Sequence, residues 1–235
     1  GRGAGGGGGD VDRPARLADG AGQRAPPGRP TQPARIGAHG RLDGIGRRAG
    51  DGGAVRAVSA LFAAVGHSKR RAHRAQRAVV EVIQREFPHH AFLGEEGSAG
   101  QSSDSEYRWI LDPLDGTTNY VHGVPFFAVS LALEFQGRPI VGVVYDPMLR
   151  ERFTAVAGCG AQLNDQTIRV SNVDRLSDAL VSIGLPARVV ADSVDVHWMV
   201  QSAVHCLSIR RTGSAALNMA YLAAGRFDIS WALTT

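Results

Sequence analysis

The chain has 235 residues, 43% of them hydrophobic, and a formal net charge of +4. A chain of this length can bury a real core in one large domain or two small ones. No apolar run reaches the roughly 18 residues of a membrane span, and no apolar signal region is visible near the N-terminus, so we expect a cytoplasmic protein with no membrane partner.

The excess positive charge comes largely from arginines in residues 1–77, and Lys69 is the only lysine. We interpret this as a bias in composition and not as a binding patch, so nucleic acid is not expected as a partner. The two cysteines, Cys159 and Cys206, have no metal-ligand spacing and are predicted to be reduced thiols.

Residues 1–66 have the composition of a low-complexity segment. They contain more than half of the 30 glycines, several prolines and hardly any aromatic residues. Such a segment buries too little apolar surface to offset the entropy of the chain. It is either a disordered tail or the product of translation in a wrong frame, and the abrupt change to patterned sequence near Arg74 favours the wrong frame.

Residues 67–174 carry the patterns of an N-terminal α+β domain. Apolar residues at helical spacing predict a helix from Ala75 to Phe87, which Pro88 ends. Short apolar or alternating runs predict the strands of a sheet at 91–93, 107–111, 126–135, 140–145, 152–157 and 161–163.

Residues 175–235 are expected to form a smaller C-terminal α/β domain, because a polar stretch (Ser171–Asp178) precedes a new apolar run. Gly225 supplies a helix stop at the end of an alanine-rich segment. Helices are predicted at 194–206 and 215–224, and strands at 180–183, 208–211 and 227–231.

Two carboxylates, Asp112 and Asp115, follow the apolar run Trp109–Leu111. Carboxylate oxygens are ligands that Mg²⁺ prefers, and a turn between the two would let both face one ion, with the Leu114 carbonyl as a third ligand. The same Asp-Pro-x-Asp-Gly sequence is also a good plain turn. On these residues alone, both interpretations stay open.

Gly116, Thr117 and Thr118 follow at once. Glycine lets the backbone approach a ligand closely, and a helix that begins here would point free N–H groups at an anion such as phosphate. A helix capped by threonine, with no ligand, explains the same residues. Upstream, Glu95 lies in a Gly-Glu-Glu-Gly segment and is either a third metal-binding carboxylate or part of a solvated acidic loop.

The segment from Trp109 to Pro125 resembles the inositol monophosphatase family, as do Gly94-Glu95-Glu96, Arg210–Leu217 and Ala223–Asp228. The resemblance covers about residue 74 to the end of the chain. It implies an α+β fold, the layered α-β-α-β-α sandwich of the sugar phosphatases. It also implies Mg²⁺-dependent hydrolysis of a small-molecule phosphate monoester by a homodimer.

The family pattern implies a role for each matching residue. Glu95 and Thr117 would be catalytic, because they would orient and deprotonate the attacking water. The metal ligands would be Glu95, Asp112, Asp115 and the Leu114 carbonyl. Substrate-binding residues would be Leu114, Asp115, Gly116, Thr117 and Thr118 on the first loop, and Arg210, Gly213, Ser214 and Ala215 in the C-terminal part.

The chain departs from the family pattern at two places. A Thr-x-x-Asp element is expected upstream of Glu95, and its position falls on Ala72. The family continues into a Trp-Asp element whose Asp binds metal, whereas this chain stops at Thr235. We therefore expect a fragment, incomplete at both ends, that hydrolyses phosphate esters poorly or not at all.

Inositol-1-phosphate is the expected substrate, because Thr118-Asn119-Tyr120 looks more like the inositol group of the family than the histidinol-phosphate group. A glutamate position typical of inositol-specific members falls near Ala232, which weakens this assignment. Histidinol-phosphate, fructose-bisphosphate and nucleotide 3′-phosphate are the alternative substrates. A non-catalytic fragment that binds a partner is an alternative of another class.

Overall fold

The computed structural model describes residues 69–94 and 105–233, which belong to one compact unit. The predictions made on residues 1–66 and on Glu95 lie outside the described residues. The described part begins with helix α3 (Lys69–Glu86), which confirms the predicted helix and starts earlier than expected. Pro88 follows the helix end, as predicted.

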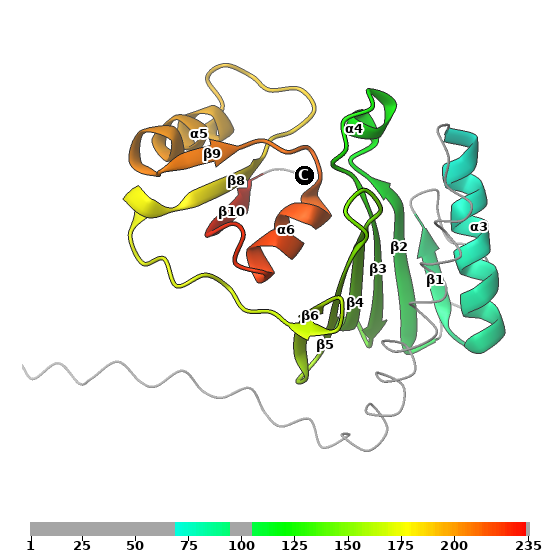
Figure 1. The fold of residues 1–235 in the computed structure, drawn as a ribbon. Coiled ribbons are helices and arrows are strands. Elements are labelled where there is room, and N and C mark those ends of the chain that lie inside the picture. Colours follow the sequence, from blue (N-terminus) through cyan, green and yellow to red (C-terminus); the bar gives the residue numbers. More distant parts are fainter. Residues whose placement is uncertain (1–68, 95–104, 234–235) are drawn as a thin grey trace, which may run out of the picture. The chain divides into compact units, whose positions relative to one another are not determined.

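In the described part of the chain, seven strands form one sheet, and they follow one another in the order of the sequence. β1 and β2 pair in parallel and all later neighbours pair antiparallel, so the chain meanders across the sheet (Figure 1). Only β7 was not predicted, since a strand of two residues is too short to show alternation. The strands are β1 (Ala91–Gly94), β2 (Tyr107–Asp115), β3 (Ala128–Phe135), β4 (Arg138–Asp146), β5 (Glu151–Val156), β6 (Gly160–Leu163) and β7 (Gln166–Thr167).

One face of this sheet packs against α3. Val79 and Ile83 lie one helical turn apart on α3, and they belong to the same buried cluster as Trp109, Leu131 and Leu133 of the sheet. Each fully buried side chain of this kind stabilises the fold by about 1.5–3 kcal/mol relative to exposure. The sheet that carries the candidate site is therefore anchored on its far face.

β2 differs from its prediction. The predicted strand ends at Leu111 and delivers Asp112 at its end, which is wrong, because β2 continues to Asp115. The register with β3 is regular as far as Asp112, is interrupted, and resumes at Asp115. The interruption keeps Pro113 out of the hydrogen-bonding ladder, where a proline has no N–H to donate.

Three further strands form a parallel sheet in the order β10-β8-β9. Its buried centre consists of Ala179, Val181 and Ile183, with Met199 and Trp231 packed against it. The elements of this part lie close to their predicted ranges. They are β8 (Leu180–Gly184), α5 (Val194–His205), β9 (Ser208–Arg210), α6 (Ala215–Ala223) and β10 (Ile229–Ala232). The 3₁₀ turn η2 (Leu176–Asp178), which precedes β8, was not predicted.

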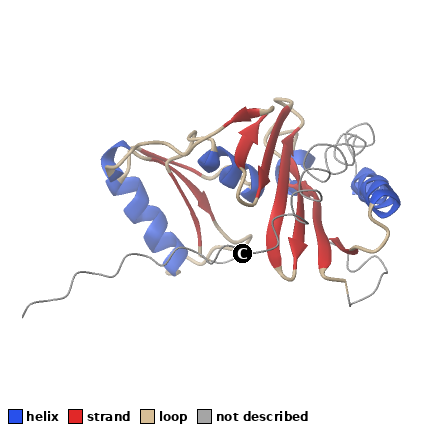
Figure 2. Cartoon of the chain, turned by 90° about the horizontal axis from the view of Figure 1, so that it is seen from below, coloured by secondary structure: helices blue, strands red, loops and turns tan. Residues whose placement is uncertain are grey.

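The elements stack as alternating layers of helix and sheet (Figures 1 and 2). Helix α6 contacts β3 and β4 of the larger sheet and β10 of the smaller one, while α3 packs on β2 and α5 packs on β9. This is the layered α-β-α-β-α arrangement that the resemblance implies. Among the described helices, none has the length and apolar character needed to cross a membrane.

Candidate metal and phosphate site

The end of β2 folds into a tight turn that brings Asp112, Leu114 and Thr117 together. The Leu114 N–H donates to Asp112 Oδ1 over 2.9 Å, and Thr117 Oγ1 donates to the Leu114 carbonyl over 2.9 Å. Both bonds join a side chain to nearby backbone, which is how aspartate and threonine stabilise turns. The plain turn is therefore present, and binding of a metal ion by the same oxygen atoms stays a prediction.

Gly116 is required by geometry at the start of helix α4 (Thr117–Val121). Its φ of +84° lies in the left-handed region that favours glycine. A Cβ atom at this position would lie 3.0 Å from the Phe126 carbonyl oxygen. The residue that caps α4 is Gly116, with no side-chain hydrogen bond, so the predicted threonine cap is wrong. The first amides of a helix have no intrahelical acceptor, which leaves those of Thr117 and Thr118 suited to an anion.

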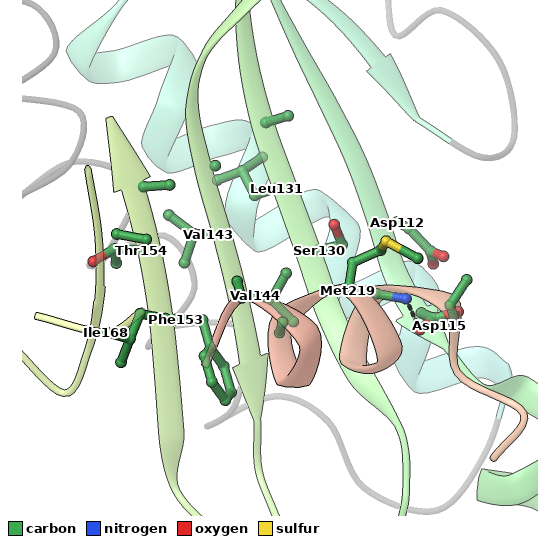
Figure 3. A pocket seen from close by; sticks show the side chains of 18 residues that line it. Asp112, Asp115, Ser130, Leu131, Val143, Val144, Phe153, Thr154, Ile168 and Met219 are labelled. Carbon is green, nitrogen blue, oxygen red and sulfur yellow. Dashed lines mark hydrogen bonds between the residues drawn. The ribbon is translucent and has the colours of Figure 1, made fainter. Parts of the chain in front are cut away.

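Asp115 faces the N-terminal turn of α6 (Figure 3). Its carboxylate accepts hydrogen bonds from Ser214 Oγ, from the Ala215 N–H over 3.2 Å and from the Ala216 N–H over 2.9 Å. Ser214 also caps its own helix, since its Oγ accepts from the Leu217 N–H. A carboxylate is favoured at this position because the N-terminal end of a helix carries partial positive charge. The structure thus brings together the two groups of predicted residues, around Asp115 and around Ser214.

Asn119 joins the same two regions and was given no role in the sequence-based prediction. Its Nδ2 donates to the Phe126 carbonyl and to the Thr212 carbonyl, both over 2.7 Å. Thr212 lies 93 positions further along the chain. No local spacing connects positions so far apart, so the sequence showed Asn119 only as a member of the motif.

A cavity of about 540 Å³ opens between α6 and the inner face of the larger sheet. Asp112 and Asp115 lie at one end of it, beside Ser130 and Met219 (Figure 3). The rest of the wall is mostly apolar and includes Ala132, Val144, Phe153 and Ile168. An apolar space with few polar groups at one end is the usual form of a small-molecule site.

The oxygen donors of the turn fit Mg²⁺. Asp112, the Leu114 carbonyl and Asp115 supply only hard oxygen atoms, which this ion prefers to nitrogen or sulfur. A carbonyl oxygen has two lone pairs, so the bond from Thr117 still leaves Leu114 one for a cation. Within the described ranges there is no group of three His, Cys, Asp or Glu side chains that could hold a metal. The third predicted carboxylate, Glu95, lies outside those ranges.

Arg210 is exposed, and its Nη1 donates to Ser208 Oγ over 2.6 Å and to the Ile209 carbonyl over 2.8 Å. The Arg210 side chain is thus hydrogen-bonded to residues of its own strand, β9. A role of Arg210 in substrate binding stays a prediction. Cys159 and Cys206 are both free thiols, as predicted.

A second polar cluster lies where β4 ends and β5 begins. Asp146 is fully buried, and burial raises the pKa of its carboxyl above the ordinary value, although N–H groups of Leu149 and Met148 oppose this shift. Arg226 forms two bonds of 2.5 and 2.6 Å with Glu151. These bonds raise the pKa of the Arg226 guanidinium.

Residues 67–235 match the inositol monophosphatase family. The chain belongs to this family. Among curated members, the Nus factor SuhB of Pasteurella multocida is 44% identical over 154 residues, which are 65% of this chain and 58% of that protein. The inositol-1-monophosphatase of Rhizobium meliloti is 44% identical over 162 residues, which are 67% of this chain and 60% of that protein. The chain thus spans about 58–60% of the length of these inositol monophosphatase relatives.

Solved structures of the inositol monophosphatase family share the fold. The inositol monophosphatase from Anabaena is 37% identical with a TM-score of 0.70, over 83% of this chain and 75% of that one. An IMPase/NADP phosphatase complexed with Mg²⁺ and phosphate is 27% identical with a TM-score of 0.57, over 66% of this chain and 57% of that one.

Proposed function

We propose that this site catalyses the Mg²⁺-dependent hydrolysis of a phosphate monoester, with inositol-1-phosphate as the first candidate substrate. The observation that carries the proposal is one turn, in which the oxygens of Asp112, Leu114 and Asp115 immediately precede the N-terminus of α4. The oxygen atoms can bind a cation, and the neighbouring N–H groups can bind an anion. Such an arrangement suits a phosphate that contacts both the cation and the N–H groups. The relative named inositol-1-monophosphatase and the neighbour complexed with Mg²⁺ and phosphate support this proposal.

Three groups of the turn would hold the metal ion. Mg²⁺, when bound, would neutralise charge on the phosphoryl group and make a nearby water easier to deprotonate. Asp112 and the Leu114 carbonyl would bind it from β2. Asp115 would bind from the end of the strand, where three hydrogen bonds from the start of α6 already fix its carboxylate. A fixed ligand loses little entropy when the ion binds.

Thr117 would orient the attacking water. Its hydroxyl proton is donated to the Leu114 carbonyl, so its oxygen is left to accept a further hydrogen. A water that donates to Thr117 would keep a lone pair for the phosphorus, and Glu95 is the proposed acceptor of its other proton. The amides of Gly116, Thr117 and Thr118 would bind the phosphate oxygens.

The alcohol part of the substrate would lie toward the start of α6. Gly213, Ser214 and Ala215 are the proposed contacts, because Asp115 brings this segment to the metal-binding turn. Arg210 on β9 is a further proposed contact. The apolar wall of the adjoining cavity offers few hydrogen-bonding groups, so the hydroxyl groups of an inositol would depend on this rim.

Phosphate release from inositol-1-phosphate, with and without Mg²⁺, tests the proposal. We expect release that requires Mg²⁺, stops on addition of a chelator and is lost in Asp112→Asn. The rate is predicted to be low, because Ala72 occupies the position of a family carboxylate. Release that continues unchanged in the chelator or in Asp112→Asn would refute the proposed site.

A second candidate function is a non-catalytic binding role. Several relatives carry the name Nus factor SuhB, among them the one from Pasteurella multocida, and the name denotes a factor and not a hydrolase. A chain that binds Mg²⁺ yet releases no phosphate from any of the four candidate esters would favour this role. A homodimer, expected from the family resemblance, and a cytoplasmic location, expected from the composition, stay predictions.

A further inference from the structure

We propose that Asn119 is a positioning residue that ties the metal-binding turn to the start of α6 and thereby fixes the Asp115 carboxylate. The two parts it joins are the metal loop (residues 112–119) and the α6 turn (Thr212–Ala216). The contact is made by one side-chain amide between elements far apart in sequence. Its effect on catalysis rests on the proposed function, whereas its effect on the geometry of Asp115 does not.

The chemistry of the contact admits one orientation of the Asn119 side chain. Its two partners, the carbonyls of Phe126 and Thr212, can only accept hydrogen bonds, and both lie 2.7 Å from Nδ2. Both N–H groups of the amide are therefore used. Aspartate has nearly the same shape but would turn a carboxylate oxygen toward two carbonyl oxygens, so Asn119→Asp replaces two attractive contacts by repulsion.

Packing confirms that the two segments are in close contact. Gly213 has a φ of +85°, and a Cβ atom there would lie 3.0 Å from Asn119 Nδ2 and 3.1 Å from Asn119 Oδ1. The backbone of Gly213 therefore lies against the amide of Asn119. A glycine is needed here both for the backbone conformation and for this close approach.

The α6 turn is held from its other side by the helix itself. Thr212 Oγ1 donates to Oδ1 of the buried Asn218, one turn into α6. Ser214, only 1% exposed, bonds both Asp115 and the Leu217 N–H. Asn119 thus attaches the metal loop to a turn that further hydrogen bonds hold in place, and this attachment brings the N–H and O–H donors of the turn to Asp115.

The first test is amide hydrogen exchange of the full chain, followed by NMR without Mg²⁺ and without substrate. In Asn119→Asp we expect the Ala215 and Ala216 amides to exchange about tenfold faster or more, because their acceptor is no longer held in place. The amides of Leu131 and Leu133 in the core strand β3 should keep their rates. Asn172→Asp, the same chemical change at an exposed position between β7 and η2, is the matched control and should alter neither pair.

The second readout separates positioning from general stability. Because Asn119 acts on Asp115, Asn119→Asp should raise the Mg²⁺ concentration for half-maximal phosphate release by about tenfold while KM for the ester changes less. If Asn119→Asp does not fold, Asn119→Ser removes the amide without introducing charge. In the parent chain, the side-chain NH₂ protons of Asn119 should themselves be protected from exchange.

Unchanged exchange at Ala215 and Ala216 in a folded Asn119→Asp, or rapidly exchanging Asn119 NH₂ protons in the parent, would overturn the inference. Faster exchange at these two amides with β3 unchanged supports it, even in a chain that releases no phosphate. Absence of phosphate release in the parent bears only on the proposed function.

Discussion

Asp115 and Asp146 each end a strand of the same sheet, β2 and β4, yet they have different environments. Asp115 lines a cavity, and its hydrogen-bond donors come from a helix about one hundred residues away. Asp146 is fully buried, and its Oδ1 accepts from Met148 and Leu149 in its own turn. Among the described residues, Asp146 Oδ2 has no hydrogen-bond partner. Two similar sequence positions thus give one candidate ligand and one structural carboxylate.

The origin of the hydrogen-bond donors therefore matters as much as their number. Donors within a local turn fix only that turn, whereas donors from a distant helix fix two elements relative to each other. A movement of α6 would therefore change the position of the Asp115 carboxylate. Asp146 is placed where burial opposes its ionisation.

The largest expected difference between the two carboxylates is in activity. Asp115→Asn should lower Mg²⁺-dependent phosphate release by about a hundredfold or more, because it would remove a proposed metal ligand and its charge. Asp146→Asn should leave the rate unchanged. Initial rates at saturating Mg²⁺ measure the effect of each substitution. Equal losses of rate in the two variants would show that Asp115 and Asp146 do not differ in their role.

The cluster around Asp146 should instead determine stability. Arg226 binds Glu151 through two bonds and lies 4.6 Å from the centre of the Tyr221 ring. Lysine can neither form the paired bonds nor stack in this way, so Arg226→Lys should lower the free energy of unfolding by about 1–2 kcal/mol. Urea denaturation measures this loss.

The control for Arg226→Lys is a pair on the surface. Arg85 lies 3.7 Å from Glu86, and the Arg85 side chain is 72% exposed. Arg85→Lys should change the free energy of unfolding by less than about 0.5 kcal/mol. If Arg85→Lys lowered the free energy of unfolding as much as Arg226→Lys, the paired bonds of Arg226 would contribute no additional stability.

The pH dependence of Asp146 is a smaller effect with a definite sign. Burial raises the pKa of this carboxyl in the folded state above its ordinary value of 3.8. The folded state therefore binds more protons than the unfolded state between the two pKa values, and stability falls as pH rises through that window. Asp146→Asn should remove this fall, so the variant should gain stability relative to the parent as the pH increases above about 3.8. A constant difference across the pH range would contradict the assignment.

The smallest expected effect lies on the far face of the sheet, at His90. Its Nδ1 accepts from the Trp109 Nε1 over 3.0 Å, and burial, with a smaller contribution from His89, lowers the pKa of His90 below 6.5. Its contribution to stability is present above pH 6.5 and is lost as the pH falls through the lowered pKa. His90→Gln can keep an acceptor for Trp109 without titrating. Chemical unfolding at several pH values, followed by tryptophan fluorescence, should show the loss in the parent and not in His90→Gln.

Most helices and strands could be predicted because their signals are local. The helix α3 follows from apolar spacing and Pro88, and α6 ends at Ala223, just before the predicted stop at Gly225. The continuation of β2 past Pro113 could not be predicted, because it depends on a register shift against β3. Such a shift is a property of the paired strands and not of either sequence alone.

The part of the candidate site that lies on one continuous segment could be predicted from the sequence. Asp112, Leu114, Asp115 and Thr117 are close in sequence, and local hydrogen bonds hold three of them together. The contacts of Asp115 and Asn119 with the start of α6 join residues 93 to 101 positions apart. These contacts depend on how the layers pack, so the sequence shows the residues but not their pairing.

The turn around Asp112 and Asp115 is proposed to bind a divalent cation beside the start of α6. Titration of the full chain with Mn²⁺ as a paramagnetic substitute for Mg²⁺, followed by NMR, tests this binding most directly. We predict that signals of Leu114, Thr117, Ala215 and Ala216 broaden first, and that Asp112→Asn abolishes this broadening. Broadening that begins instead around Asp146 and Glu151, or that persists in Asp112→Asn, would show that the turn does not bind the ion.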